Sequence, residues 1–81
     1  MKKEKLVKTY RGPSMYQITV DGKVDGPLVK NMNGMSVIHN RIKNKTVSTL
    51  TGELSDQSAL NGILDTLYDY HYTVISVLKL Q

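Results

Sequence analysis

The sequence predicts a small α+β domain, in which one helix packs on one face of a small mixed, mostly antiparallel sheet of three to four strands. One segment has apolar residues at the helical period, and the segments around it have apolar residues that alternate or run continuously. Their order along the chain is strand, strand, strand, helix, strand (β-β-β-α-β). A chain of 81 residues forms one domain with a thin core, so the helix and the sheet must share a single apolar layer.

The chain is expected to divide into a flexible basic N-terminal extension at residues 1–14 and a single α+β domain at residues 15–81. The first segment is rich in lysine, ends in Arg-Gly-Pro-Ser and has too little apolar content to fold alone. Its apolar residues Leu6, Val7 and Tyr10 leave open an added edge strand.

The first strand of the domain is expected to begin at Met15. From there Tyr16, Ile18 and Val20 alternate with polar residues, and an Asp-Gly pair then provides a turn. Residues 23–34 contain Gly-Pro and Asn-Gly pairs, which interrupt any regular pattern. We therefore expect a long loop there, with room for a short irregular strand.

Two further strands, at residues 35–43 and 46–50, are expected to form a hairpin. The turn is placed at Asn44-Lys45, because asparagine readily adopts the left-handed backbone conformation. A slip of the register by one residue would exchange the two faces. The expected pairs are Ile42 with Val47, Ile38 with Thr51, and His39 with Leu50.

The helix is expected to begin after Ser55 or Asp56, since either side chain can cap the first turn. At 100° per residue the apolar side chains fall on one stripe, and polar side chains fall opposite. This pattern predicts an amphipathic helix that lies on the sheet. The stripe consists of Leu60, Ile63, Leu64 and Leu67, with Ala59 and Tyr70 at its flanks.

The final strand is expected at residues 72–80. Val74 and Leu78 fall on one alternation face, and Ile75 and Val77 fall on the other. Apolar residues on both faces predict a central strand, or a strand that another chain covers on its second face. The connection through the helix is long enough for a crossover, so this strand is expected to run parallel to the preceding one.

The helix region carries a resemblance to known sequences. Residues 56–64 read Asp-Gln-Ser-Ala-Leu-Asn-Gly-Ile-Leu, after a strand that ends in Thr-Gly and before a strand that contains Val-Ile-Ser-Val. In these features the chain resembles a group of short bacterial proteins of uncharacterised function, loosely over residues 15–80 and well over residues 50–78. The resemblance implies a small α+β fold from a bacterium or its mobile elements, and it implies no activity.

The composition argues against disulfide bonds, a membrane span and secretion. The chain contains no cysteine, and no apolar run approaches the roughly 20 residues needed to cross a bilayer. Its first residues lack the apolar centre of a secretion signal. We therefore expect a cytoplasmic protein without disulfides and without a membrane partner.

No motif in the sequence indicates enzymatic chemistry. The sequence contains no nucleophile motif for which His39 or His71 could act as the base. No second metal ligand lies near His39 in the sequence. His71 is interpreted as a packing residue at the end of the helix. The glycines do not follow the order of a phosphate-binding loop. We expect no catalytic residue, metal, cofactor or small-molecule substrate.

Charge is distributed unevenly along the chain. Residues 1–45 contain ten of the eleven Lys and Arg residues and three carboxylates, a net charge of +7. Residues 46–81 contain one lysine and four carboxylates, a net charge of −3. Such asymmetry indicates contact with nucleic acid or an acidic partner, although the codon usage of an AT-rich genome explains it equally well. The candidate nucleic-acid-binding residues are Lys2, Lys3, Lys5, Lys8 and Arg11 in the extension, and Arg41, Lys43 and Lys45 at the hairpin tip.

The outer face of the helix has features that an ordinary solvated face does not require. Gly62 lies away from the apolar stripe, where glycine costs about 1 kcal/mol relative to alanine. Asp65 and Asp69 form a like-charged pair in the half of the helix where the dipole disfavours anions. Tyr68 and Tyr72 border this pair, and tyrosine is enriched at interfaces. We predict a contact surface for a basic partner or a second copy, and hence a non-catalytic protein-interaction module that forms a homodimer.

Overall fold

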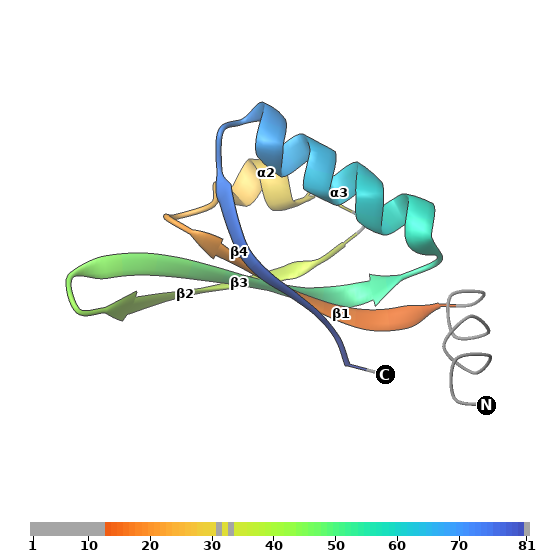
Figure 1. The fold of residues 1–81 in the computed structure, drawn as a ribbon, viewed down its shortest axis with the longest axis horizontal. Helices are drawn as coiled ribbons and strands as arrows, with labels where there is room; N and C mark the ends of the chain where they lie inside the picture. The colour runs from red at the N-terminus through yellow and green to blue at the C-terminus, as the bar shows by residue number, and fades with distance from the viewer. Residues whose placement is uncertain (1–12, 31, 33, 81) are drawn as a thin grey trace.

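The computed structural model describes residues 13–30, 32 and 34–80, and it confirms the expected α+β fold (Figure 1). A single sheet contains four strands, and both helices of the described chain lie on the same face of that sheet. The strands are β1 (Ser14–Asp21), β2 (Ser36–Ile42), β3 (Lys45–Leu54) and β4 (Thr73–Lys79). The helices are the single-turn α2 (Gly26–Lys30) and the longer α3 (Gln57–Asp69).

The strand order across the sheet is β2-β3-β1-β4, and each neighbouring pair is antiparallel. Because β3 and β4 are both antiparallel to β1, they run in the same direction, as the crossover through α3 predicts. They are not neighbours, however, since β1 lies between them. The connection from β3 through α3 to β4 is therefore a split β-α-β unit, and it carries the last strand past β1 to the far edge.

The edge position of β4 contradicts the expected central position. The central strands are β3 and β1, and β4 pairs on one side only within the described chain. The apolar pattern of β4 was not sufficient to predict its place, because the pattern reports which side chains avoid water and does not report the order of the strands. The alternative expectation, that another chain covers β4, stays a prediction.

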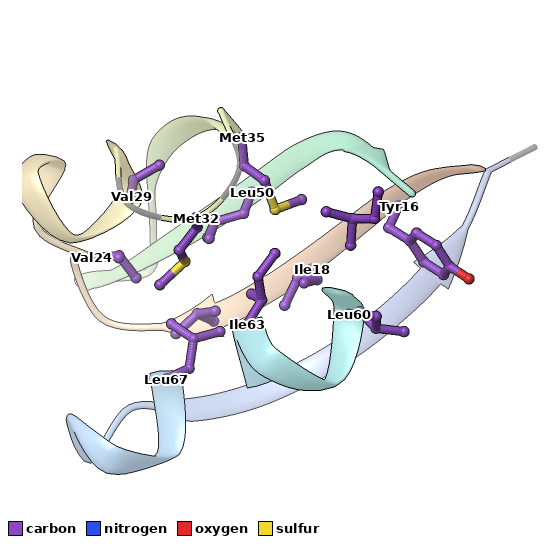
Figure 2. Close-up of a cluster of buried hydrophobic side chains, with 12 residues drawn as sticks. Tyr16, Ile18, Val24, Val29, Met32, Met35, Leu50, Leu60, Ile63 and Leu67 are labelled. Atoms are coloured by element: carbon purple, nitrogen blue, oxygen red, sulfur yellow. The ribbon is translucent and has the colours of Figure 1, made fainter. Parts of the chain in front are cut away.

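The apolar core lies between the sheet and α3, and Figure 2 shows its side chains meeting from both layers. In β1 the even-numbered residues from 14 to 20 are buried, which confirms the expected alternation. In α3, Leu60, Ile63 and Leu67 are buried and Leu64 is half-buried, as the stripe predicts. Each fully buried aliphatic side chain contributes about 1.5–3 kcal/mol relative to an exposed one, so this stripe is the main reason that α3 docks on the sheet.

The segment between β1 and β2 is more regular than expected. The Gly-Pro pair opens the helical turn α2, because proline is tolerated in the first turn, where its missing N–H has no partner in any case. Val24, Val29 and Met32 of this segment are buried. The expected long loop is therefore a short helical segment that closes one end of the core (Figure 2).

The hairpin register also differs from the expected one. Its turn residues are Lys43 and Asn44, one position earlier than predicted, with φ of 49° and 69°. Positive φ at both central residues is the type I′ geometry, which matches the twist of the flanking strands. His39 therefore pairs with Ser48 instead of Leu50. Because the pairing shifts by two residues, every side chain keeps its expected face.

Asp56 is the N-cap of α3. Its carboxylate accepts a hydrogen bond from the backbone N–H of Ala59 at 2.9 Å, which resolves the choice between Ser55 and Asp56. The bond satisfies one of the unpaired donors of the first turn, and the charge complements the positive end of the helix dipole.

Candidate protein-interaction surface

The outer edge of β4 is the most apolar exposed part of the described chain. Between positions 75 and 80, four large apolar side chains remain substantially exposed, and they are Ile75 (55%), Val77 (38%), Leu78 (52%) and Leu80 (47%). Single exposed apolar side chains are common on protein surfaces, so the grouping of four along one strand is what makes this stretch a candidate contact site. We call these four residues the β4 edge.

The side chains of the β4 edge lie on both faces of the sheet. Val77 is opposite Ile18, a core residue, so it lies on the face that carries the helices. Leu78 is opposite Gln17 and lies on the other, open face. The register shifts by one residue just before this stretch, so that Ile75 is the extra residue of a β-bulge.

The backbone N–H and C=O groups of β4 point alternately toward β1 and away from it. The N–H of Leu80 donates to the carbonyl of Met15 at 2.7 Å, so the even-numbered residues near this end of β4 direct their backbone groups toward β1. In an antiparallel ladder the intervening residues direct theirs away. The N–H and C=O of Val77 therefore point outward, beyond the last strand of the described sheet.

The predicted helix-face residues divide into two groups. Gly62, Asp65, Tyr68 and Asp69 are exposed on the outer side of α3. Tyr72 is half-buried and packs against the core, unlike the four exposed residues. Its hydroxyl donates at 3.2 Å to a backbone carbonyl of the segment before α2, so it fastens that segment to the end of α3.

Nothing in the described chain requires glycine at position 62. A Cβ built on Gly62 meets no heavy atom within 4 Å. The Gly62 carbonyl accepts an additional hydrogen bond from the hydroxyl of Thr66 at 2.9 Å. Packing within the described chain therefore does not explain Gly62, and the close approach of a partner stays a hypothesis for this residue.

Of the basic candidate residues, the three at the hairpin tip lie together. Arg41, Lys43 and Lys45 are exposed around the β2–β3 turn. The hairpin from residue 36 to residue 51 contains no acidic side chain, and Figure 1 shows it projecting past both helices. The remaining candidates lie outside the described residues, and they are Lys2, Lys3, Lys5, Lys8 and Arg11.

The two histidines have structural positions. A ring nitrogen of His39 lies 3.1 Å from the carbonyl oxygen of Val24. His71 adopts the left-handed conformation (φ 66°) directly after α3, and its N–H donates to the carbonyl of Tyr68 at 2.9 Å. His71 is exposed, so its interpretation as a packing residue was wrong. Its role is to turn the chain at the helix end, in the position that glycine most often occupies.

The described residues contain little that would hold a small ligand. No group of three or more His, Cys, Asp or Glu side chains in this part of the chain is arranged to bind a metal. An open depression of about 200 Å³ is lined by Asp25, Pro27, Leu28 and Tyr70, and it lacks the converging polar groups of a binding pocket. Neither described helix is long and apolar enough to cross a membrane.

These features define a small antiparallel α+β domain with an exposed apolar sheet edge as its most distinctive surface. The chain belongs to the family described as "Domain of unknown function (DUF8691)", whose model matches residues 15–78. The match therefore includes Ile75, Val77 and Leu78 of the β4 edge. No curated protein and no solved structure matches the chain.

The β4 edge was not identified as a surface from the sequence alone. Its residues were recognised as apolar on both faces, but a central strand has the same pattern. Only the strand order distinguishes the two cases, and strand order depends on contacts between residues far apart in the chain.

Proposed function

We propose that the chain is a non-catalytic protein-interaction module that self-associates through the β4 edge. The observation that carries this proposal is the position of the most apolar strand at the edge of the sheet. An unpaired edge offers a row of backbone donors and acceptors to an added strand, and the adjoining apolar side chains supply the affinity.

The residues of the β4 edge lack the usual protections against strand addition. Edge strands commonly carry charged side chains or proline, which discourage pairing with another chain. Residues 73–78 contain neither. Lys79, the last residue of β4, and the bulge at Ile75 are the protective features, and the bulge leaves the residues after it in regular register with β1.

The test is sedimentation velocity of the full chain over a range of concentrations, with Leu78→Lys as the variant. Leu78 is half-exposed in the monomer, and a symmetric dimer would bury part of this side chain in each of the two copies. Losing about 1–1.5 kcal/mol at each copy weakens the dimer by about 30- to 150-fold. Ile38→Lys is the matched control, because Ile38 is a similarly exposed apolar residue (60%) on the opposite edge strand. Equal dimer affinity in both variants would refute the β4 edge as the contact.

A second candidate function is contact with nucleic acid through the hairpin tip. The three exposed cations on a hairpin without acidic residues favour it, because phosphate contacts come mainly from Lys and Arg. Binding of random-sequence DNA and RNA at several salt concentrations tests it. If the tip makes the contact, replacing Arg41, Lys43 and Lys45 with alanine lowers the slope of log affinity against log salt by about 2–3. An unchanged slope would remove the tip from the contact.

A further inference from the structure

We propose that two copies of the chain pair antiparallel along β4 about a twofold axis at Val77, so that two four-stranded sheets become one continuous sheet. This arrangement rests on the proposed self-association and specifies its geometry. Three features of the described residues support it: the direction of the backbone groups, the distribution of the apolar side chains and the absence of charge at the centre of the strand.

The backbone argument concerns which residue can lie on the axis. Val77 directs its N–H and C=O away from β1, toward the place where an added strand would lie. Two copies of an outward-facing residue placed opposite each other exchange two N–H···O=C bonds, one in each direction. A twofold axis at Val77 therefore satisfies the backbone groups of both copies at the centre of the interface.

The side-chain argument concerns what meets across the axis. With the axis at Val77, the two Val77 side chains lie side by side on the helix face, and Ser76 of one copy lies opposite Leu78 of the other on the open face. The exposed apolar residues of the β4 edge extend from Ile75 to Leu80, so this register places them close to the centre of the contact. Apolar pairs across neighbouring strands contribute roughly 0.2–1 kcal/mol each.

The charge argument concerns the choice of a second copy as the occupant. Residues 73–78 carry no ionisable side chain, and with the axis at Val77 the Lys79 of each copy lies opposite Ile75 of the other, so no like charges are directly opposite. Backbone groups and neutral apolar side chains are self-complementary, which is the requirement for an isologous interface.

The arrangement has a consequence for the whole assembly. An axis that relates antiparallel neighbouring strands stands perpendicular to the sheet, so both copies present the same face to the same side. The α3 helices of the two copies would cover one face together, and the two open faces would form one continuous surface.

Cysteine scanning tests the register, because the chain contains no cysteine of its own. Single variants Ser76→Cys, Val77→Cys and Leu78→Cys are oxidised mildly at concentrations where the unmodified chain is dimeric. Directly opposite residues of a hydrogen-bonded pair have Cα atoms about 5.5 Å apart, within the range of a disulfide. Copies of residue 76, or of residue 78, would be about 8 Å apart and beyond that range. We expect a covalent homodimer from Val77→Cys alone, and a mixed dimer when Ser76→Cys and Leu78→Cys are combined.

Each outcome separates the register from the proposed function. Self-association of the unmodified chain with a homodimeric cross-link at position 76 or 78, or at none of the three, overturns the axis at Val77 and leaves the interaction module intact. A chain that is monomeric at every concentration overturns the proposed function as well. The combined Ser76→Cys and Leu78→Cys sample tests the same axis independently of Val77, so a folding defect of one variant does not decide the question.

Discussion

Replacing Ser48 with alanine should destabilise the domain far more than the loss of one hydroxyl on a strand suggests. The Ser48 side chain is fully buried, and its oxygen accepts from the N–H of Val24 at 3.0 Å and donates to the carbonyl of Gly22 at 2.7 Å. These two bonds fasten the segment between β1 and α2 to β3. Without the hydroxyl, the N–H of the buried Val24 loses its acceptor, at a cost of about 1–3 kcal/mol.

The loss of the second bond adds a smaller penalty. The carbonyl of Gly22 belongs to a half-buried residue, so water can replace the donor, and the net loss is about 1 kcal/mol. The total for Ser48→Ala is about 2–4 kcal/mol, a large share of the stability of a domain this small. For a domain of this size, that loss lowers the unfolding temperature by roughly 8–32 °C.

Urea unfolding followed by circular dichroism measures this effect. Thr49→Ala is the matched control, since Thr49 is the next residue of β3 and is half-buried on the open face. We expect the control to lose less than about 1 kcal/mol, because it changes only a strand surface position. If Ser48→Ala lost no more free energy of unfolding than Thr49→Ala, with the same slope against urea concentration, the Ser48 hydroxyl would not be what fastens the segment between β1 and α2.

Three further predictions concern single positions of the same fold. Gly52→Ala should lower the free energy of unfolding in urea by about 1–3 kcal/mol, because the added Cβ would lie 3.1 Å from Cα and Cγ of Met35. Unchanged stability would show that Met35 moves freely. His71→Gly should stabilise by about 1 kcal/mol by removing a side chain from a left-handed position, and a loss would mean that the imidazole makes a contact of its own. The double variant Asp65→Lys/Asp69→Lys should raise the free energy of unfolding by a few tenths of a kcal/mol, because cations are favoured in the C-terminal half of the helix. It should leave the sedimentation behaviour unchanged, and a weaker dimer would place α3 in the interface.

The parts of the fold that the sequence predicted are those that local patterns determine. The alternation in β1 and the apolar stripe of α3 each follow from the geometry of one element, and the structure confirms both. The end of the helix near His71 was predicted, but the left-handed conformation of His71 was not, because glycine is its usual signal. The helical turn α2 was missed because Gly-Pro, which usually marks a loop, also suits the first turn of a helix.

The parts that were not predicted depend on turn geometry or on contacts between distant residues. The hairpin register follows from twist, which favours Lys43-Asn44 as a type I′ turn over the neighbouring pair, and the two pairs differ by only one position in sequence. The clustering of Gly62, Asp65, Tyr68 and Asp69 was predictable, because these residues share one helix and its period. The separation of Tyr72 from them was not, since it depends on where the chain turns after α3.

The strand β4 is where the local pattern and the topology disagree, and the proposed dimer removes the disagreement. Its apolar residues on both faces are typical of a central strand, yet in one chain it pairs on one side only. An antiparallel pair of β4 strands would give each one a neighbour on both sides. In that assembly the strand would occupy the central position that its sequence predicts, at the junction of the two sheets. The apolar side chains of β4 would then gain neighbours from the second copy at the junction, which the fold of one chain does not supply.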